Sequence, residues 1–279
     1  MRTLKFLFVC LSVILTGCAG IAGAPNYKVG ATFRDVYNIG LSQIPLPEGE
    51  WKLIWYYKEF VNQYPFHYAL LIQTREGKLS KVVEAISPGR QHTAGYSPSR
   101  FCERTDIIYM QKRANFSGGK QDCWGINHIE MTLEDDWNQV YESQDRALRA
   151  EGIELPENML IVNYYKGGHG KILEVYYGFN PELEGFPPPT NPSWSHSHWH
   201  KSRYMRDNKK IKYINRLKKW GTAWDSKIND GFAGRLSVGK SSADELSAKL
   251  EQLQQLVDDG VITRDDYDRK KQELLDALE

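Results

Sequence analysis

The chain has 279 residues, of which 41% are hydrophobic, 12% aromatic and 25% charged, a composition typical of globular proteins rather than disordered or fibrous ones. The formal net charge is +1, from 36 Lys and Arg residues against 35 Asp and Glu residues, so we expect no nucleic-acid partner. The mean hydropathy of −0.55 excludes a protein with many membrane-spanning helices.

The N-terminus has the layout of a secretory signal peptide. Arg2 and Lys5 lead into an apolar run over residues 6–15, which is shorter than the roughly 20 residues that a spanning helix needs. Residues 15–18 read Leu-Thr-Gly-Cys, a string that resembles the lipobox of bacterial lipoproteins. The resemblance implies that residues 1–17 are removed and that Cys18 carries a covalent diacylglycerol or acyl lipid.

The residues after Cys18 predict an anchored location. Ala19 follows the cysteine in place of an aspartate, which resembles the class of lipoproteins sorted to the outer membrane. Residues 18–26 are small and contain glycine and proline, as expected of a flexible tether between lipid and folded domain. We therefore expect a bacterial cell-envelope protein that is lipid-anchored at the outer membrane and faces the periplasm.

Two cysteines remain in the folded part of the chain. Cys102 and Cys123 are left once Cys10 is removed with the signal peptide and Cys18 is acylated. An even pair in an exported protein predicts one disulfide. The alternative is a catalytic cysteine paired with a histidine, which an oxidising compartment disfavours.

Residues 27–180 predict a mostly antiparallel, β-rich α+β domain. Aromatic and β-branched runs are broken by turn residues, and hairpins are expected over residues 68–86, 106–131 and 159–177. The string Gly-Gly-His-Gly at 167–170 lacks the following helix of a phosphate-binding loop, so it predicts a hairpin turn. One helix is expected from a capping box at 132–135, with Leu148 on its apolar face.

Residues 181–200 predict an ordered linker that is rich in proline and aromatic residues. His196, His198 and His200 alternate within it, and on a strand they would share one face, which makes them weak candidates for a zinc or copper site. Tryptophans lie between them and no Cys or carboxylate lies close by in sequence, so a packing role is the competing interpretation, and no metal is assigned.

Residues 201–230 predict a basic amphipathic helix, followed by a Gly/Ser-rich hinge. Its apolar face comprises Ile211, Ile214, Leu217, Trp224 and Ile228. The basic surface comprises Arg206, Lys209, Lys210, Lys212, Arg216 and Lys219. This surface could bind an anionic envelope surface beside the lipid anchor, or it could pair with the acidic C-terminal segment, which is the interpretation we favour.

Residues 243–279 predict two short amphipathic helices joined by a tight turn. The apolar positions are Leu250, Leu253, Leu256, Ile262, Tyr267, Leu274 and Leu275, around a Gly260-x-Ile-Thr263 core. This pattern resembles the SHOCT domain, a short C-terminal helical module. The resemblance implies a role in oligomerisation or partner docking, without catalytic residues, and so small a module should need a partner surface.

No pattern for a catalytic site was found, because the chain lacks a nucleophile elbow, an HExxH motif and a paired-carboxylate motif. We therefore expect a non-enzymatic binding or scaffold protein whose partner, or second copy, is held through residues 243–279. The alternative is a periplasmic ligand- or metal-binding domain, including a hydrolytic one, that uses the cluster at residues 196–200.

Overall fold

The fold was analysed in a computed structural model of the chain. The structure describes residues 27–131, 139–191, 193–237, 250, 253–254, 256–257 and 262–276. The predicted signal peptide, Cys18, the predicted tether and the expected capping box at 132–135 lie outside the described residues, as do the side chains of Leu274 and Leu275.

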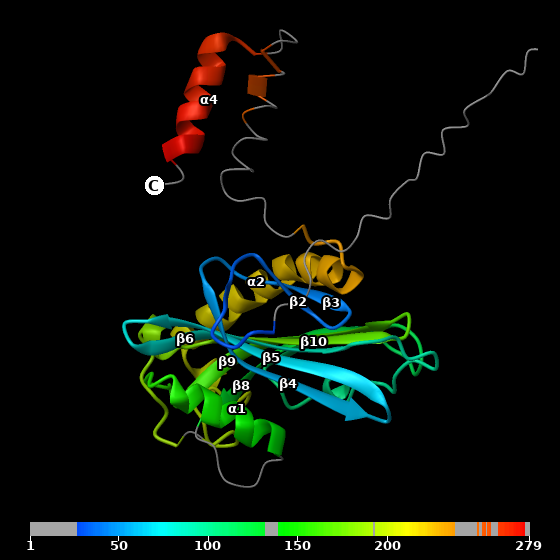
Figure 1. The fold of residues 1–279 in the computed structure, drawn as a ribbon. Coiled ribbons are helices and arrows are strands. Elements are labelled where there is room, and N and C mark those ends of the chain that lie inside the picture. The colour runs from blue at the N-terminus through cyan, green and yellow to red at the C-terminus, as the bar shows by residue number, and fades with distance from the viewer. Residues whose placement is uncertain are drawn as a thin grey trace, which may run out of the picture.

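The described body is built on one antiparallel sheet of eight strands in the order β1-β4-β5-β6-β10-β9-β8-β7, with a separate β2–β3 hairpin (Figure 1). The strands are β1 Thr32–Phe33, β2 Val36–Ile39, β3 Ser42–Pro45, β4 Trp51–Val61, β5 Tyr64–Arg75, β6 Lys78–Pro88, β7 Tyr109–Asn115, β8 Gln121–Glu130, β9 Asn158–Gly168 and β10 Lys171–Phe179. The helices are α1 Gln139–Ala150, α2 Asn208–Ala233 and α4 Arg264–Asp276, with short 3-10 turns at Phe101–Glu103, Glu182–Glu184 and Tyr204–Arg206. The predicted α+β class with a helical C-terminal segment is confirmed.

The three predicted hairpins are present as β5–β6, β7–β8 and β9–β10. At the β9–β10 turn, His169 has a φ of 50° and Gly170 a φ of 70°, the left-handed conformation that a tight turn requires. Gly170 also could not carry a Cβ, because that atom would lie 2.6 Å from the His92 carbonyl oxygen. Residues 167–170 therefore form a hairpin turn rather than a phosphate-binding loop.

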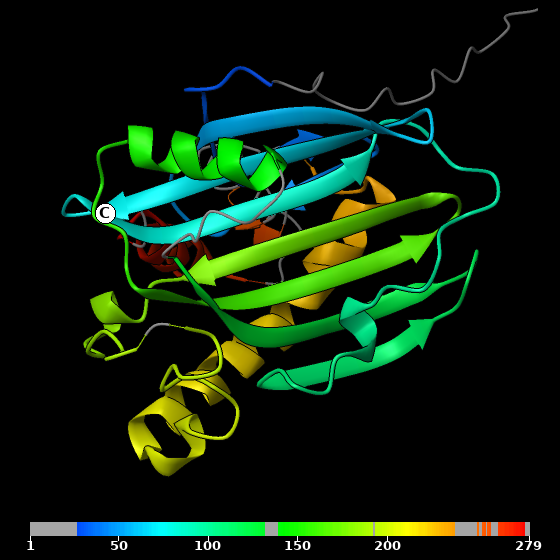
Figure 2. The ribbon, with the colours of Figure 1, turned by 90° about the horizontal axis from the view of Figure 1, so that it is seen from below.

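The two faces of the sheet are covered by different elements. Helix α2 and the β2–β3 hairpin pack on one face, where alternate strand residues such as Leu71, Val83 and Val175 form the main core with Leu217 and Ile228 of α2. Helix α1 covers the opposite face on the side of β4 and β5, whereas β10 and β9 lie to one side of the helix (Figure 2). We call these the α2 face and the α1 face.

The sequence boundary at residue 180 does not separate two units. Phe186, Trp199 and Tyr213 lie in the same buried cluster as the sheet residues, so residues 181–200 form part of the body rather than a linker. The basic helix begins at Asn208 instead of residue 201, because the Asp207 side chain caps it by accepting from the Lys209 backbone N–H at 2.8 Å. It runs on to Ala233 and ends at Gly234, which has a φ of 71°.

The disulfide and the apolar face of α2 agree with expectation. Cys102 and Cys123 form a disulfide between the short 3-10 turn and β8, although Cys123 lies toward the tip of the β7–β8 hairpin rather than at its base. Ile214, Leu217 and Ile228 are buried against the sheet. Among the described residues, no helix combines the length and apolar character needed to cross a membrane.

Candidate functional site

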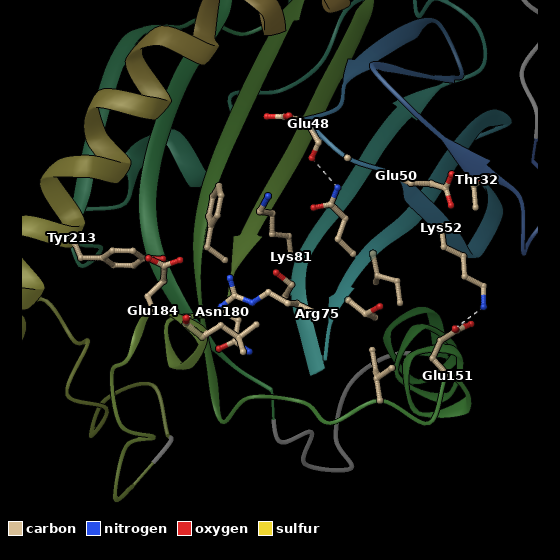
Figure 3. A pocket seen from close by; sticks show the side chains of 18 residues that line it. Thr32, Glu48, Glu50, Lys52, Arg75, Lys81, Glu151, Asn180, Glu184 and Tyr213 are labelled. Carbon is tan, nitrogen blue, oxygen red and sulfur yellow. Dashed lines mark hydrogen bonds and ion pairs between the residues drawn. The ribbon is translucent and has the colours of Figure 1, made fainter. Parts of the chain in front are cut away.

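A pocket of about 740 Å³ lies at the end of the sheet where β5 turns into β6 (Figure 3). Its walls come from the β3–β4 loop, the segment after α1, the end of β10 and Tyr213 of α2. Ile72 and Phe179 supply apolar surface. This volume falls in the range of small-molecule sites.

Charged side chains of both signs line this pocket, and most of them are already paired. Lys52 forms a 2.6 Å ion pair with Glu151, and the Arg75 guanidinium donates to the Leu183 carbonyl oxygen at 2.6 Å. Lys81 forms no ion pair within the described part of the chain. The pocket can therefore accept a polar ligand, and among the described residues that line it no nucleophile is hydrogen-bonded to a general base.

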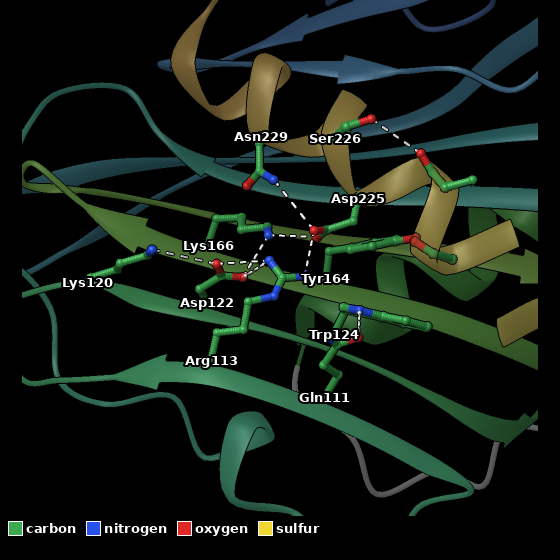
Figure 4. Close-up of polar contacts among 12 residues, drawn as sticks. Gln111, Arg113, Lys120, Asp122, Trp124, Tyr164, Lys166, Asp225, Ser226 and Asn229 are labelled. Atoms are coloured by element: carbon green, nitrogen blue, oxygen red, sulfur yellow. Dashed lines mark hydrogen bonds and ion pairs between the residues drawn. The ribbon is translucent and has the colours of Figure 1, made fainter. Parts of the chain in front are cut away.

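A second polar site is the buried cluster that joins α2 to the sheet (Figure 4). The Lys166 amine lies 2.7 Å from both Asp122 and Asp225, and its side chain is only 3% exposed. Arg113 lies 3.0 Å from Asp122 and 2.5 Å from Asp225. Two cations balance two carboxylates in this cluster, which is how proteins keep buried charges without a large desolvation cost.

The cluster has a structural role that the sequence analysis missed. Asp225 projects from α2 toward β8 and β9, and the neighbouring Tyr164 hydroxyl donates to the Gly221 carbonyl oxygen at 2.7 Å. A Cβ on Gly221 would lie 2.5 Å from the Trp124 ring, so α2 and the sheet pack in close contact here. One sequence signal could have revealed this role of Asp225: it is a charged residue on the apolar face of the helix, one turn from both Gly221 and Ile228.

The three candidate metal histidines are not arranged on one strand face. Residues 193–200 form turns, and the ring of His196 lies 3.0 Å from two serine hydroxyls, whereas the Nδ1 of His200 lies 2.9 Å from the Ser202 hydroxyl. The described residues contain no group of three His, Cys, Asp or Glu side chains placed to hold a metal ion. These residues do not form the strand on which a shared histidine face would depend, because Trp199 packs into the core, where its ring lies 4.9 Å from that of Phe186.

The structure instead places His128 beside this segment. Its Nε2 donates to the Trp194 carbonyl oxygen at 3.0 Å, its ring stacks on Trp194, and burial lowers its pKa to about 4. His198 is also held neutral, because burial lowers its pKa to about 4. These neutral rings contribute to the packing of residues 193–200 against β8.

Part of the basic surface of α2 is used within the body. Lys209 donates to the Gly185 carbonyl oxygen at 2.8 Å, Arg216 lies 2.6 Å from Glu184, and Lys210 lies over the Trp199 ring. Lys212 and Lys219 are exposed, whereas Arg206 is exposed in the turn before the helix. Some residues of the basic surface therefore bind the turn at residues 184–185, and the others face solvent.

The described C-terminal residues have the expected local chemistry. The Asp266 backbone N–H donates to the Thr263 hydroxyl at 3.2 Å, while the Thr263 backbone N–H donates to the Asp266 carboxylate at 3.3 Å. This reciprocal pair caps α4. Leu250, Leu253, Ile262 and Tyr267 are half-buried, and Leu256 is 37% exposed.

Comparison with known proteins identifies only the C-terminal segment. The family model described as SHOCT, short C-terminal domain, matches residues 248–275. No curated protein and no solved structure matches the chain. The C-terminal segment is therefore a SHOCT domain, attached to an antiparallel α+β body.

Proposed function

We propose that this protein is a lipid-anchored scaffold of the bacterial cell envelope, in which the body is tethered through Cys18 and the SHOCT domain holds a second copy or a protein partner. The lipobox-like residues 15–18 support the anchor. The SHOCT match and the half-buried apolar residues of that segment support the docking role.

The observation that carries the proposal is that both ends of the body lie against the same hairpin. The Gly40 backbone N–H, in the β2–β3 turn, donates to the Tyr27 hydroxyl at 3.2 Å. The Leu236 backbone N–H donates to the Gln43 side-chain oxygen of β3 at 2.8 Å. The chain thus enters and leaves the body at one place on the α2 face.

The entry point is held firmly, as a tethered body requires. The Tyr27 ring stacks on Tyr56 with centroids 4.2 Å apart, and the Tyr56 hydroxyl is hydrogen-bonded to the His67 ring at 2.6 Å. A tether attached here would bring the α2 face nearer to the membrane than the α1 face. The exposed lysines of α2 then lie where an anionic surface or the acidic SHOCT segment can meet them.

The anchor is tested by following a labelled fatty acid into wild-type protein and Cys18→Ser. We expect label and membrane fractionation in the wild type alone, with Cys10→Ser behaving as wild type because Cys10 leaves with the signal peptide. Label that persists in Cys18→Ser overturns the anchor.

The docking role is tested by crosslinking in detergent-solubilised membranes, comparing the full chain with a chain that lacks residues 243–279. We expect the self-crosslink or partner crosslink to disappear on truncation. Tyr267→Ala in the full chain is the finer variant, and Arg269→Ala, at an exposed position on the same helix, is its control. Crosslinks that survive truncation overturn the docking role and leave the anchor unaffected.

A further inference from the structure

The α1 face carries an acidic pair that neither the anchor nor the SHOCT domain explains. Glu84 of β6 stands opposite Tyr176 of β10, and Glu174 lies two residues before Tyr176 on the same strand. Strand residues alternate between faces. Because Val83, Ala85 and Val175 point into the α2-side core, Glu84 and Glu174 project together from the α1 face.

Both carboxyl groups lack a cationic partner. Glu174 accepts from the Tyr176 hydroxyl at 2.6 Å and from the Asn163 amide at 3.2 Å, and Glu84 accepts from the Gln144 side chain of α1. Within the described part of the chain, no Lys, Arg or His forms an ion pair with either residue. Glu84 and Glu174 are half-buried, and carboxylates that are largely withdrawn from water without a counterion are costly, so they hold a proton or accept an external cation.

The electrostatics agree with this geometry. Burial raises the pKa of Glu84 to about 7, and the neighbouring Glu174 carboxyl contributes to the rise. Burial also raises the pKa of Glu174. The pair therefore holds on to protons at a higher pH than two exposed carboxyl groups would, and a nearby cation would favour its charged form.

A third acceptor lies beside the pair. Asn163 of β9 is only 4% exposed, its amide nitrogen is bonded to Glu174, and its side-chain oxygen has no hydrogen-bond partner. A buried acceptor without a partner costs about 1–3 kcal/mol. An unfilled acceptor on a side chain that is bonded to Glu174 is the arrangement expected of a site whose donor comes from a ligand.

Aromatic rings surround these acceptors. Tyr176 lies between Glu84 and Asn163 across the strands, and Tyr165 stands opposite Glu174 on β9. On the neighbouring β5, Tyr68 packs against Tyr57 with centroids 6.1 Å apart. Glu84, Glu174 and Tyr176 keep part of their surface exposed to solvent, so a ligand can reach the pair.

We propose that Glu84, Glu174 and Asn163 form a binding site for a primary ammonium group. An ammonium has three N–H donors, which match two carboxylates and one amide oxygen, and organic cations are stabilised by the faces of tyrosine rings. The site does not depend on the proposed anchor, although that anchor would direct it away from the membrane. A metal ion is a poorer fit, because two carboxylates and one amide leave most of a coordination shell to water.

The ammonium could belong to a free amine or to a lysine side chain on a protein. The two sources are distinguished by titrating the folded chain that lacks residues 1–18 with 1,5-diaminopentane and, separately, with an acetylated tripeptide that contains one lysine. Binding of the diamine alone indicates a small-molecule site, and binding of the peptide alone indicates a protein ligand.

We expect saturable binding by calorimetry at pH 7, with Glu84→Gln and Glu174→Gln each weakening the affinity at least tenfold. Glu50→Gln is the matched control, because Glu50 is an exposed carboxylate whose side chain lies 3.4 Å from Arg34. Wild-type binding should release protons, seen as a buffer-dependent heat, and should weaken as the pH falls below about 7, because Glu84 then takes up a proton. The wild-type measurements keep the test valid if a variant fails to fold.

The proposal is overturned if neither probe binds by millimolar concentration, or if both Gln variants bind as tightly as the wild type. It is also overturned if Mg²⁺ or Ca²⁺ binds at the same residues and excludes the amines, because the site would then be a metal site.

Discussion

The buried cluster between α2 and the sheet offers a quantitative test of how this fold is held together. Replacing Lys166 with methionine preserves most of the side-chain volume but leaves Arg113 as the one partly buried counterion of Asp122 and Asp225, beside the exposed Lys120 at 4.0 Å from Asp122. Removing one partner of a buried ion pair typically costs 3–5 kcal/mol. We expect Lys166→Met to lower the free energy of unfolding by about that amount, out of a total of roughly 5–15 kcal/mol.

The same reasoning predicts that a second substitution restores part of the loss. Asp225→Asn alone leaves an excess positive charge, whereas Lys166→Met with Asp225→Asn leaves Arg113 balanced by Asp122. The double variant should therefore lose at least about 1 kcal/mol less than the sum of the single variants.

Urea unfolding followed by tryptophan fluorescence, with the disulfide intact, measures these free energies. Lys120→Met is the control, because Lys120 is 71% exposed and lies 4.0 Å from Asp122, where an ion pair contributes less than about 1 kcal/mol. If Lys166→Met costs no more than the control, or if the two single losses simply add, then the cluster does not hold α2 by charge compensation.

Three further outcomes follow from the packing. Because burial lowers the pKa of His128 to about 4, this imidazole takes up a proton between about pH 6.5 and 4 only in the unfolded chain. The free energy of unfolding should therefore fall by roughly 3 kcal/mol as the pH drops through that window. The difference between the urea midpoints at pH 7 and pH 4.5 should be smaller in His128→Gln than in the wild type. Gly221→Ala should destabilise the protein, because a Cβ placed 2.5 Å from Trp124 costs about 1–3 kcal/mol in overpacking, more than the roughly 1 kcal/mol that alanine gains in a helix; an unchanged thermal midpoint would contradict this. Replacing Cys102 and Cys123 together with alanine should cost about 3 kcal/mol, since they are 21 residues apart, and a reductant should then lower the wild-type midpoint but leave that of the variant unchanged.

The local elements were predictable because their signals lie within a few residues of each other. The turn at residues 74–77 and the glycines at 167–170 marked two of the hairpins, and the spacing of Leu217 and Ile228 marked the buried face of α2. The ends of α2 were less accurate, since a run of basic residues before Asn208 looked helical in composition while Asp207 provided the cap.

The candidate sites were mostly beyond the reach of sequence patterns. His196, His198 and His200 looked like a metal site only under the assumption of a strand, and the burial of Trp199 imposed turns instead. Glu84 and Glu174 had a weak signal, in that each is a charged residue in the middle of a strand that is otherwise rich in apolar residues. Nothing in the sequence showed that β6 and β10 are neighbours, so the two carboxylates could not be paired.

Short-range chemistry accounts for the features visible in the chain alone: the lipobox-like residues, the pairing of the two remaining cysteines, the hairpins and the Thr263–Asp266 cap of the SHOCT helix. The tertiary structure decided which distant charges meet. Asp225 reaches Arg113 across 112 residues of sequence and Lys166 across 59, and the strand order brings the Glu84 strand beside that of Glu174. Charge pairing depends on distance and burial in space, and both are set only when the sheet and α2 pack together.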